Sequence, residues 1–274
     1  MTDVPVVARA GAVHTNVPLV MGIVNVTPDS FSDGGRFLDA AAAIEHGREL
    51  LAEGAAIVDV GGESTRPGAA PVDVDTELRR VLPVVEGLVA HGRVSIDTRK
   101  PEVARAAVAA GATLINDVSA SLWDVAADLG VGWIAMHMQG EPGTMQLAPH
   151  YDDVVAEVRA FLAERAETAV AAGVTEVWID PGFGFGKTDA HNLALLAGLD
   201  RIVQLGWPVL VGTSRKAMLG RLLADSDGGT EPVPVDDRLA GSIATEVWAM
   251  HQGAAMVRAH DVRSAVQAAK VVAA

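Results

Sequence analysis

The chain has no cysteine among its 274 residues, so neither a disulfide nor a thiolate-held metal can form. Aromatic residues are also few, with five Phe, five Trp and one Tyr, although half of all residues are hydrophobic. A core of this composition must be mainly aliphatic, which is typical of the buried strands of parallel sheets. The apolar content is enough for a sizeable core and gives no sign of disorder.

Basic residues are scarce: 21 Lys and Arg stand against 35 Asp and Glu, a formal net charge of −14. Nucleic acids and membrane surfaces are polyanions, so a chain this acidic is a poor candidate for nonspecific binding to either. No apolar run reaches the roughly 18 residues of a membrane span. Residues 1–16 lack the basic start and apolar stretch of a secretory signal. We therefore expect a cytoplasmic protein.

Short apolar runs alternate with longer amphipathic stretches along the chain. The runs are residues 19–24, 56–60, 93–96, 113–115, 132–136, 176–179, 208–211 and 254–257. Helical spacing is clearest at residues 39–53, 75–90, 101–110, 152–172, 190–205 and 236–252. Pro101 stands where a helix should begin, and Gly54, Gly111 and Gly173 stand where helices should end.

Eight strands alternating with helices predict an α/β fold with a parallel sheet. The count of eight and the chain length favour a single-domain (β/α)8 TIM barrel. A doubly wound open sheet is the alternative, which the pattern alone does not exclude. We expect residues 19–274 to form the barrel and residues 1–18 to form an N-terminal extension. Residues 224–235, rich in Asp, Gly and Pro, are predicted to be a loop.

Polar side chains follow nearly every apolar run, where barrel enzymes place their chemistry. They are Asn25, Asp59, Asp97, Asn116, Asp117, His137, Asp180, Ser214, Arg215, Lys216, Arg258 and His260. An Asp after a strand is often only the N-cap of the next helix. We assign that role to Asp117 and Asp261, and for Asp97 and Asp180 both interpretations stay open. Recurrence at nearly all eight positions favours a functional site.

Three of the connecting loops have informative compositions. Residues 25–37 form a long connection containing Pro28 and two glycines, and should be mobile. Residues 61–68 read GGESTRPG, which suits an anion because glycines expose N–H groups and Arg binds in bidentate fashion, although an ordinary turn is the alternative. Residues 180–187 read DPGFGFGK. That stretch matches neither a P-loop nor a dinucleotide-binding fingerprint, because its glycine spacing is wrong.

Cations gather after the seventh and eighth predicted strands. They are Arg215, Lys216, Arg258 and His260, which Arg66 and Lys187 could join. Barrel enzymes frequently bind phosphate there, although an internal ion-pair network with Asp59, Asp97 and Asp180 is the alternative. Asp97, Asn116 and Asp180 could bind a flat heterocycle or a metal. A zinc site is disfavoured, because His137 and His260 lie far apart in sequence and no HxH or HExxH spacing occurs.

Eight motifs together resemble the dihydropteroate synthase family of the folate pathway. They are MGIVNVTPDSFSDGG, DVGGESTRPGA, SIDTRKP, INDVS, MHMQG, DPGFGFGK, GTSRK and VRAHDV, in the family's order from Met21 nearly to the C-terminus. The resemblance implies a transferase that joins 6-hydroxymethyl-7,8-dihydropterin pyrophosphate to para-aminobenzoate, giving 7,8-dihydropteroate and pyrophosphate. It also implies Mg²⁺ as cofactor, inhibition by sulfonamides and a homodimer.

Residue roles follow from the same resemblance, by motif position. The pterin-binding residues would be Asp97, Asn116, Asp180 and Lys216, and the magnesium contact would be Asn25. The pyrophosphate ligands would be Arg66, Arg258 and His260, with Thr65 beside them. The para-aminobenzoate pocket would contain Phe31, Pro67, Phe185 and Ser214. Asp33 would be the loop acid that faces the developing cation. Ala259 departs from the family, where Val or Thr is usual, and residues 1–18 and 119–123 match nothing distinctive.

The physical chemistry of these residues agrees with a dissociative reaction. Cations and magnesium would stabilise the departing pyrophosphate, and buried carboxylates would stabilise the cationic methylene left on the pterin. A Schiff base at Lys216 is the weaker interpretation of that lysine. Two competing functions remain at this point: a methyltetrahydrofolate methyltransferase on the same kind of barrel, and a paralogue that binds pterin without catalysis.

Overall fold

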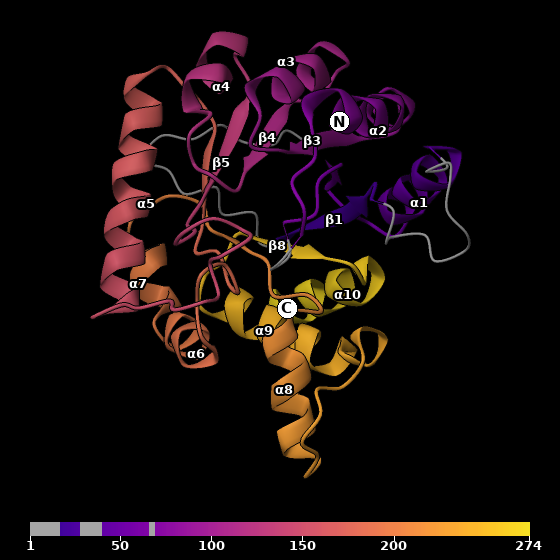
Figure 1. Cartoon of the computed structure of the whole chain (residues 1–274). Helices are drawn as coiled ribbons and strands as arrows, with labels where there is room; N and C mark the ends of the chain where they lie inside the picture. Colours follow the sequence, from indigo (N-terminus) through magenta and orange to yellow (C-terminus); the bar gives the residue numbers. More distant parts are fainter. Residues whose placement is uncertain (1–16, 28–39, 66–68) are drawn as a thin grey trace.

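A computed structural model of the chain describes residues 17–27, 40–65 and 69–274. Parallel strands form one curved sheet, and helices lie around its outer face (Figure 1). The strands are β1 (Leu19–Asn25), β2 (Ile57–Gly61), β3 (Arg93–Asp97), β4 (Leu114–Asp117), β5 (Gly132–Met136), β6 (Val177–Asp180), β7 (Leu210–Val211) and β8 (Met256–Ala259). Each overlaps one predicted apolar run, so the prediction of a single-domain TIM barrel is confirmed.

The sheet is almost closed into a barrel, and its weakest seam lies between β6 and β7. The strand order is β6-β5-β4-β3-β2-β1-β8-β7. Across the seam, β6 and β7 are joined through an isolated bridge between Ile179 and Val209, beside a 3.0 Å hydrogen bond from the Ile179 amide to the Pro208 carbonyl. The open doubly wound sheet, which the sequence left as an alternative, is therefore wrong.

The helices account for most of the amphipathic stretches. Their bounds are α1 (Ala40–Ala52), α2 (Val74–Leu88), α3 (Pro101–Ala109), α4 (Trp123–Leu129), α5 (Val154–Ala171), α6 (Asp189–Ala197), α7 (Leu199–Val203), α8 (Ala217–Ser226), α9 (Leu239–His251) and α10 (Val262–Val272). The stretch 190–205 divides at Gly198 into α6 and α7. The predicted loop 224–235 is shorter than expected, because α8 continues to Ser226. Among the described residues, no helix is both long enough and apolar enough to cross a membrane.

Two successive layers of side chains point into the barrel. The lower layer is apolar and takes one residue from each of seven strands: Met21, Ile57, Leu114, Ile134, Trp178, Leu210 and Met256. Side chains alternate along a strand, so the residue two places further also points inward. Those residues include Asp59, Asn116, Asp180 and Arg258. The same alternation that buries the lower layer therefore collects polar groups above it.

Candidate active site

A hydrogen-bonded network joins three predicted site residues, Asp97, Asn116 and Arg258, and it includes Asp59 as well. Arg258 on β8 donates from Nε to Asp59 Oδ2 at 2.7 Å and from Nη2 to Asp97 Oδ2 at 2.8 Å. Asn116 Nδ2 donates to the same Asp59 oxygen at 2.8 Å. The strand ends of β2, β3, β4 and β8 are thus bound together by side chains. Asp59 was predicted as a strand-end residue and a possible ion-pair partner, but not as a member of the site.

Burial and charge set the protonation of this network. Asp59 is fully buried, and its Oδ1 has no hydrogen-bond partner among the described residues. Burial raises the pKa of Asp97 to about 7; the Arg258 guanidinium opposes that shift and the Asp59 carboxylate adds to it. Burial alone would lower the pKa of Arg258, but Asp59 and Asp97 outweigh it and raise that pKa. Arg258 is therefore permanently charged, whereas Asp97 titrates near neutrality.

Asp180 and Lys216 form the second group, on the two sides of the β6–β7 seam. Burial raises the pKa of the Asp180 carboxyl, and the nearby Lys216 ammonium opposes that shift. Lys216 donates to the Phe183 carbonyl and lies 4.6 Å from the centroid of the Phe185 ring. Burial lowers the pKa of Lys216 to about 8, against the attraction of Asp180. The ammonium form of the lysine still predominates at neutral pH.

Ser214 and His260 lie side by side after β7 and β8. The Ser214 hydroxyl accepts from the His260 backbone N–H at 3.1 Å and lies 3.1 Å from His260 Nδ1. A residue predicted for the para-aminobenzoate pocket is thus held to one predicted for pyrophosphate. The two loops that follow β7 and β8 consequently share a wall of the site.

The remaining predicted residues divide into two sets. Asn25 ends β1, half-buried, and is paired in register with Gly61, which is paired in turn with Asp97. Thr65 follows β2 and is half-buried. Four residues lie outside the described part of the chain: Phe31, Asp33, Arg66 and Pro67.

Two cations that the sequence placed near the phosphate point elsewhere. Arg215 donates from Nε and Nη2 to both carboxylate oxygens of Asp261, at 2.9 and 2.6 Å. Asp261 occupies the N-cap position of α10, as predicted, but its side chain makes no capping hydrogen bond, so the prediction was right about the position and wrong about the interaction. The N-cap assignment of Asp117 was also wrong, because Leu122 is the N-cap of α4 and that helix has no side-chain capping bond. Asp117 instead accepts from the backbone N–H groups of Ser121 and Leu122 in the turn before α4.

Lys187, the other such cation, is buried behind the loop that follows β6. Its Nζ lies 2.9 Å from His137 Nδ1 and donates to the carbonyls of Gly182 and Phe185 at 2.9 and 3.0 Å. Every carbonyl from Gly182 to Gly186 accepts a side-chain hydrogen bond; the donors are Lys187, Lys216, Gln146 and Tyr151. Lys187 therefore shapes the loop that carries Phe185, and it does not face an anion.

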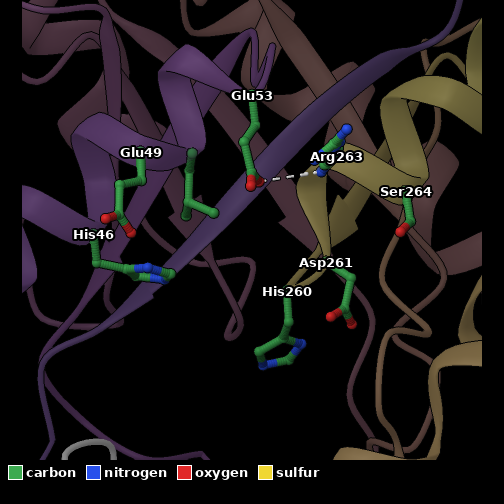
Figure 2. Close-up of a pocket in the computed structure, with 8 residues that line it drawn as sticks. His46, Glu49, Glu53, His260, Asp261, Arg263 and Ser264 are labelled. Carbon is green, nitrogen blue, oxygen red and sulfur yellow. Dashed lines mark hydrogen bonds between the residues drawn. The ribbon is translucent and has the colours of Figure 1, made fainter.

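A pocket of about 290 Å³ lies between α1 and the start of α10 (Figure 2). It is lined by His46, Glu49, Leu50, Glu53, His260, Asp261, Arg263 and Ser264. Glu53 accepts from the Arg263 backbone N–H at 3.2 Å across it. His260 is the only predicted site residue in its lining. The three carboxylates of this lining make it unsuited to a second anion.

No group of three His, Asp or Glu side chains among the described residues could hold a metal ion by itself. Mg²⁺ differs from zinc in this respect, because it keeps several waters and is usually bound by one or two protein groups together with substrate phosphates. The amide oxygen of Asn25, at the end of β1, fits such a shared arrangement.

Comparison with known proteins identifies the family. The family described as pterin binding enzyme matches residues 21–260. The dihydropteroate synthase of Mycobacterium leprae is 52% identical over 264 residues, covering 93% of this chain and 92% of that protein. The chain belongs to the dihydropteroate synthase family. The resemblance drawn from the eight motifs is confirmed, and with it the expectation of a transferase that synthesises dihydropteroate.

Solved structures of dihydropteroate synthases share the fold over nearly the whole chain. The Xanthomonas albilineans enzyme with 4-aminobenzoic acid has a TM-score of 0.85 and 52% identity, covering 93% of this chain and 92% of that one. The Yersinia pestis enzyme in a sulfonamide drug complex has a TM-score of 0.87 and 43% identity, covering 98% of both chains. A methyltransferase, the first competing function, is therefore set aside.

Proposed function

We propose that this dihydropteroate synthase binds the pterin ring with Asp97, Asn116, Asp180 and Lys216, and the pyrophosphate with Arg258 and His260. The observation that carries the proposal is the single network joining Arg258 to Asp97 and, through Asp59, to Asn116. A cation that is hydrogen-bonded to the ring-binding acid Asp97 can contact the leaving group of the same substrate. The geometry thus supports one continuous site for both halves of the pterin pyrophosphate.

The chemistry assigned to these residues is charge stabilisation. The bond between the pterin methylene and pyrophosphate breaks, and the electron pair leaves with pyrophosphate, where Arg258 and His260 stabilise it. The methylene becomes cationic and is stabilised by the buried carboxylates of Asp97 and Asp180, whose environments are described above. The amine nitrogen of para-aminobenzoate then attacks the methylene and loses a proton. No protein nucleophile takes part.

The second substrate is proposed to lie against the Phe185 ring and Ser214. The ring of Phe185 stacks over Lys216, which fixes one wall. Phe31 and Pro67 from the two preceding loops stay predicted members of this pocket. Thr65 and Arg66 stay predicted for the neighbouring pyrophosphate region, and Asp33 stays the predicted loop acid that faces the developing cation. Because the Yersinia pestis enzyme is known in a sulfonamide drug complex, we expect sulfonamides to compete with para-aminobenzoate here.

Magnesium is proposed to reach the site with the pyrophosphate. Asn25 would supply one oxygen ligand, and the substrate phosphates and water would supply the others. When bound, the ion would neutralise charge on the leaving group. Arg258 and His260 would supply the remaining positive charge.

A homodimer is proposed through the face formed by α6 and α9. Both helices have exposed large apolar side chains, Leu193 on α6 (44% exposed) and Leu239 and Trp248 on α9 (42% and 47% exposed). The Trp248 indole N–H donates to the Leu196 carbonyl at 2.8 Å, which joins the two helices into one surface. Apolar patches of this kind mark protein interfaces. Sedimentation of the wild type and of Trp248→Glu would test it: the substitution should give a monomer.

The proposed function is tested by incubating the protein with pterin pyrophosphate, para-aminobenzoate and Mg²⁺ and measuring dihydropteroate. Lys216→Ala should nearly abolish turnover, because it removes the cation beside Asp180. Lys270→Ala, on the exposed end of α10, is the matched control and should behave as wild type. Absence of product from folded wild-type protein would favour a paralogue that only binds pterin, and normal turnover by Lys216→Ala would refute the role of that lysine.

A further inference from the structure

Arg215 has a backbone conformation that its residue type disfavours. Its φ is +56°, and in the described part of the chain Ala120 is the only other non-glycine residue with a positive φ. The left-handed region is unfavourable for residues with a Cβ and persists only where surrounding structure enforces it. Arg215 lies between Ser214 and Lys216, two residues of the proposed site, so the direction of both side chains depends on this turn.

Three separate interactions enforce the strained conformation. The Arg215 N–H donates to the hydroxyl of Ser242, which is fully buried on α9, at 2.9 Å. Its carbonyl accepts from Arg238 Nη1 at 3.1 Å. Its guanidinium makes the bidentate pair with Asp261. Backbone and side chain are thus both held, and they are held by groups outside the loop itself.

The Asp261 pair also lies beside a second link between the same two loops. Ser214 is bound to His260 and Arg215 to Asp261, so adjacent residues of the β7–α8 loop pair with adjacent residues of the β8–α10 loop. We call these four residues the loop clasp. Lys216 follows Arg215 directly, and Arg258 lies two positions before His260 on the other side, with Ala259 between them. The clasp therefore fixes the lysine that faces Asp180 relative to the cations of β8.

We propose that Arg215 is a positioning residue for the transfer reaction, acting through Lys216 and His260 without touching substrate. Its strained backbone, held by the Asp261 carboxylate, would align the ring-binding lysine with the pyrophosphate-binding residues. This inference rests on the roles proposed above for Lys216 and His260. It assigns Asp261 a function as well: its carboxylate holds the Arg215 side chain within the clasp, turned away from the pyrophosphate.

The chain offers a matched control for the ion pair. Arg221 on α8 makes an equally good bidentate pair with Asp189 on α6, with both distances at 2.6 Å. That pair joins two helices and includes no site residue. Arg215→Lys and Asp261→Asn break the bidentate geometry of the clasp, and Arg221→Lys and Asp189→Asn break it in the control. Arg215→Gly removes the side chain but relieves the strain, since glycine adopts positive φ readily.

Steady-state kinetics with both substrates would test the proposal. We expect Arg215→Lys, Asp261→Asn and Arg215→Gly each to lower kcat by about 10-fold or more. The double variant Arg215→Lys/Asp261→Asn should lose no more than either single variant, because the two residues act as one unit. The alkaline limb of the kcat profile, which we assign to Lys216, should move in the clasp variants and stay in place in the control variants.

Several results would overturn the proposal. Wild-type kcat in Arg215→Gly would show that the side chain positions nothing. Equal losses in the clasp and control variants, or losses that only follow the unfolded fraction, would show a purely structural role. A failure of the proposed function differs from this one, because the wild-type protein itself would then give no product before any variant is compared. Pterin pyrophosphate binding, measured by fluorescence in the same proteins, is compared among the variants once the wild type has proved active.

Discussion

Replacing Asp59 by Asn isolates the effect of one buried charge on the titration of Asp97. Asp59 Oδ2 accepts from both Asn116 and Arg258, whereas Oδ1 is buried without a partner. In Asp59→Asn, the amide oxygen can take the place of Oδ2 and the amide NH2 that of Oδ1. Both hydrogen bonds are then kept, and only the negative charge is lost.

The size of the effect follows from the geometry around Arg258. The carboxylates of Asp59 and Asp97 contact the same guanidinium and therefore repel each other at short range. Two like charges about 4 Å apart repel by about 4 kcal/mol at an effective dielectric constant of 20, which is roughly three pKa units. The shared guanidinium screens much of this repulsion. We expect the pKa of Asp97, now about 7, to fall by on the order of one unit.

The sign is fixed by which form of Asp97 binds substrate. An ionised Asp97 accepts hydrogen bonds from the pterin, so affinity should rise as pH increases through its pKa. In Asp59→Asn the rise should occur at lower pH, because the carboxylate forms more easily. Titration of pterin pyrophosphate binding and of kcat/KM between about pH 5 and 9 would report this midpoint in the free enzyme.

Two further variants make the assay decisive. Asp97→Asn should remove the midpoint altogether. Asp59→Leu should weaken pterin binding at every pH, since it leaves Asn116 and Arg258 without their shared acceptor. An unchanged or higher midpoint in Asp59→Asn would refute the reasoning, because it would mean that the Asp59 charge does not control the ionisation of Asp97.

Two other side chains allow equally direct tests. Glu246 on α9 is buried, and neither of its carboxylate oxygens has a hydrogen-bond partner within residues 17–27, 40–65 and 69–274; burial, followed by the nearby Asp261, raises its pKa to about 8. An acid with a raised pKa binds more protons in the folded than in the unfolded protein, so stability is lost as pH rises from about 4.5 to about 8. Glu246→Gln should remove this loss and be more stable than wild type by a few kcal/mol near pH 8. Urea unfolding at pH 5 and pH 8 would measure the difference, and an unchanged pH dependence would contradict it. Lys187→Met leaves the carbonyls of His137, Gly182 and Phe185 without this donor. It should cost roughly 3 kcal/mol of stability and raise KM for para-aminobenzoate more than for the pterin substrate; equal changes in the two KM values would contradict a role centred on Phe185.

The fold could be predicted from the sequence because the barrel imposes a simple pattern. Seven of the eight strands contribute a large apolar residue to the lower inner layer, such as Ile57 or Leu114, and the strands also pack apolar residues against the helices outside. This arrangement produces the eight short apolar runs. Helices α4, α8 and α10 were less evident, because α4 has only seven residues and α8 begins directly after the turn at Arg215.

The site was predicted less completely, because the sequence does not show in which direction each side chain points. Asp59 lies within β2, and only the inward alternation shared with Ile57 shows that it belongs beside Asn116 and Arg258. Arg215 carries the same charge as its neighbour Lys216, yet a positive φ turns it toward Asp261. Sequence gives the charge of a residue but not the backbone angle that aims it. The motifs located the strand ends correctly, and the contacts decided which side chains meet.

The incomplete pairing of β6 with β7 has a consequence for the loaded enzyme. Asp180 ends one of these strands and Lys216 follows the other, so a pterin held by both would span this weakly paired seam. The ligand would then link β6 to β7 where few backbone hydrogen bonds join them. Amides of Ile179 and of β7 should exchange with solvent through local opening of the empty barrel, and become slow once the ring is bound. Substrate binding would thereby stabilise the closed form of the barrel.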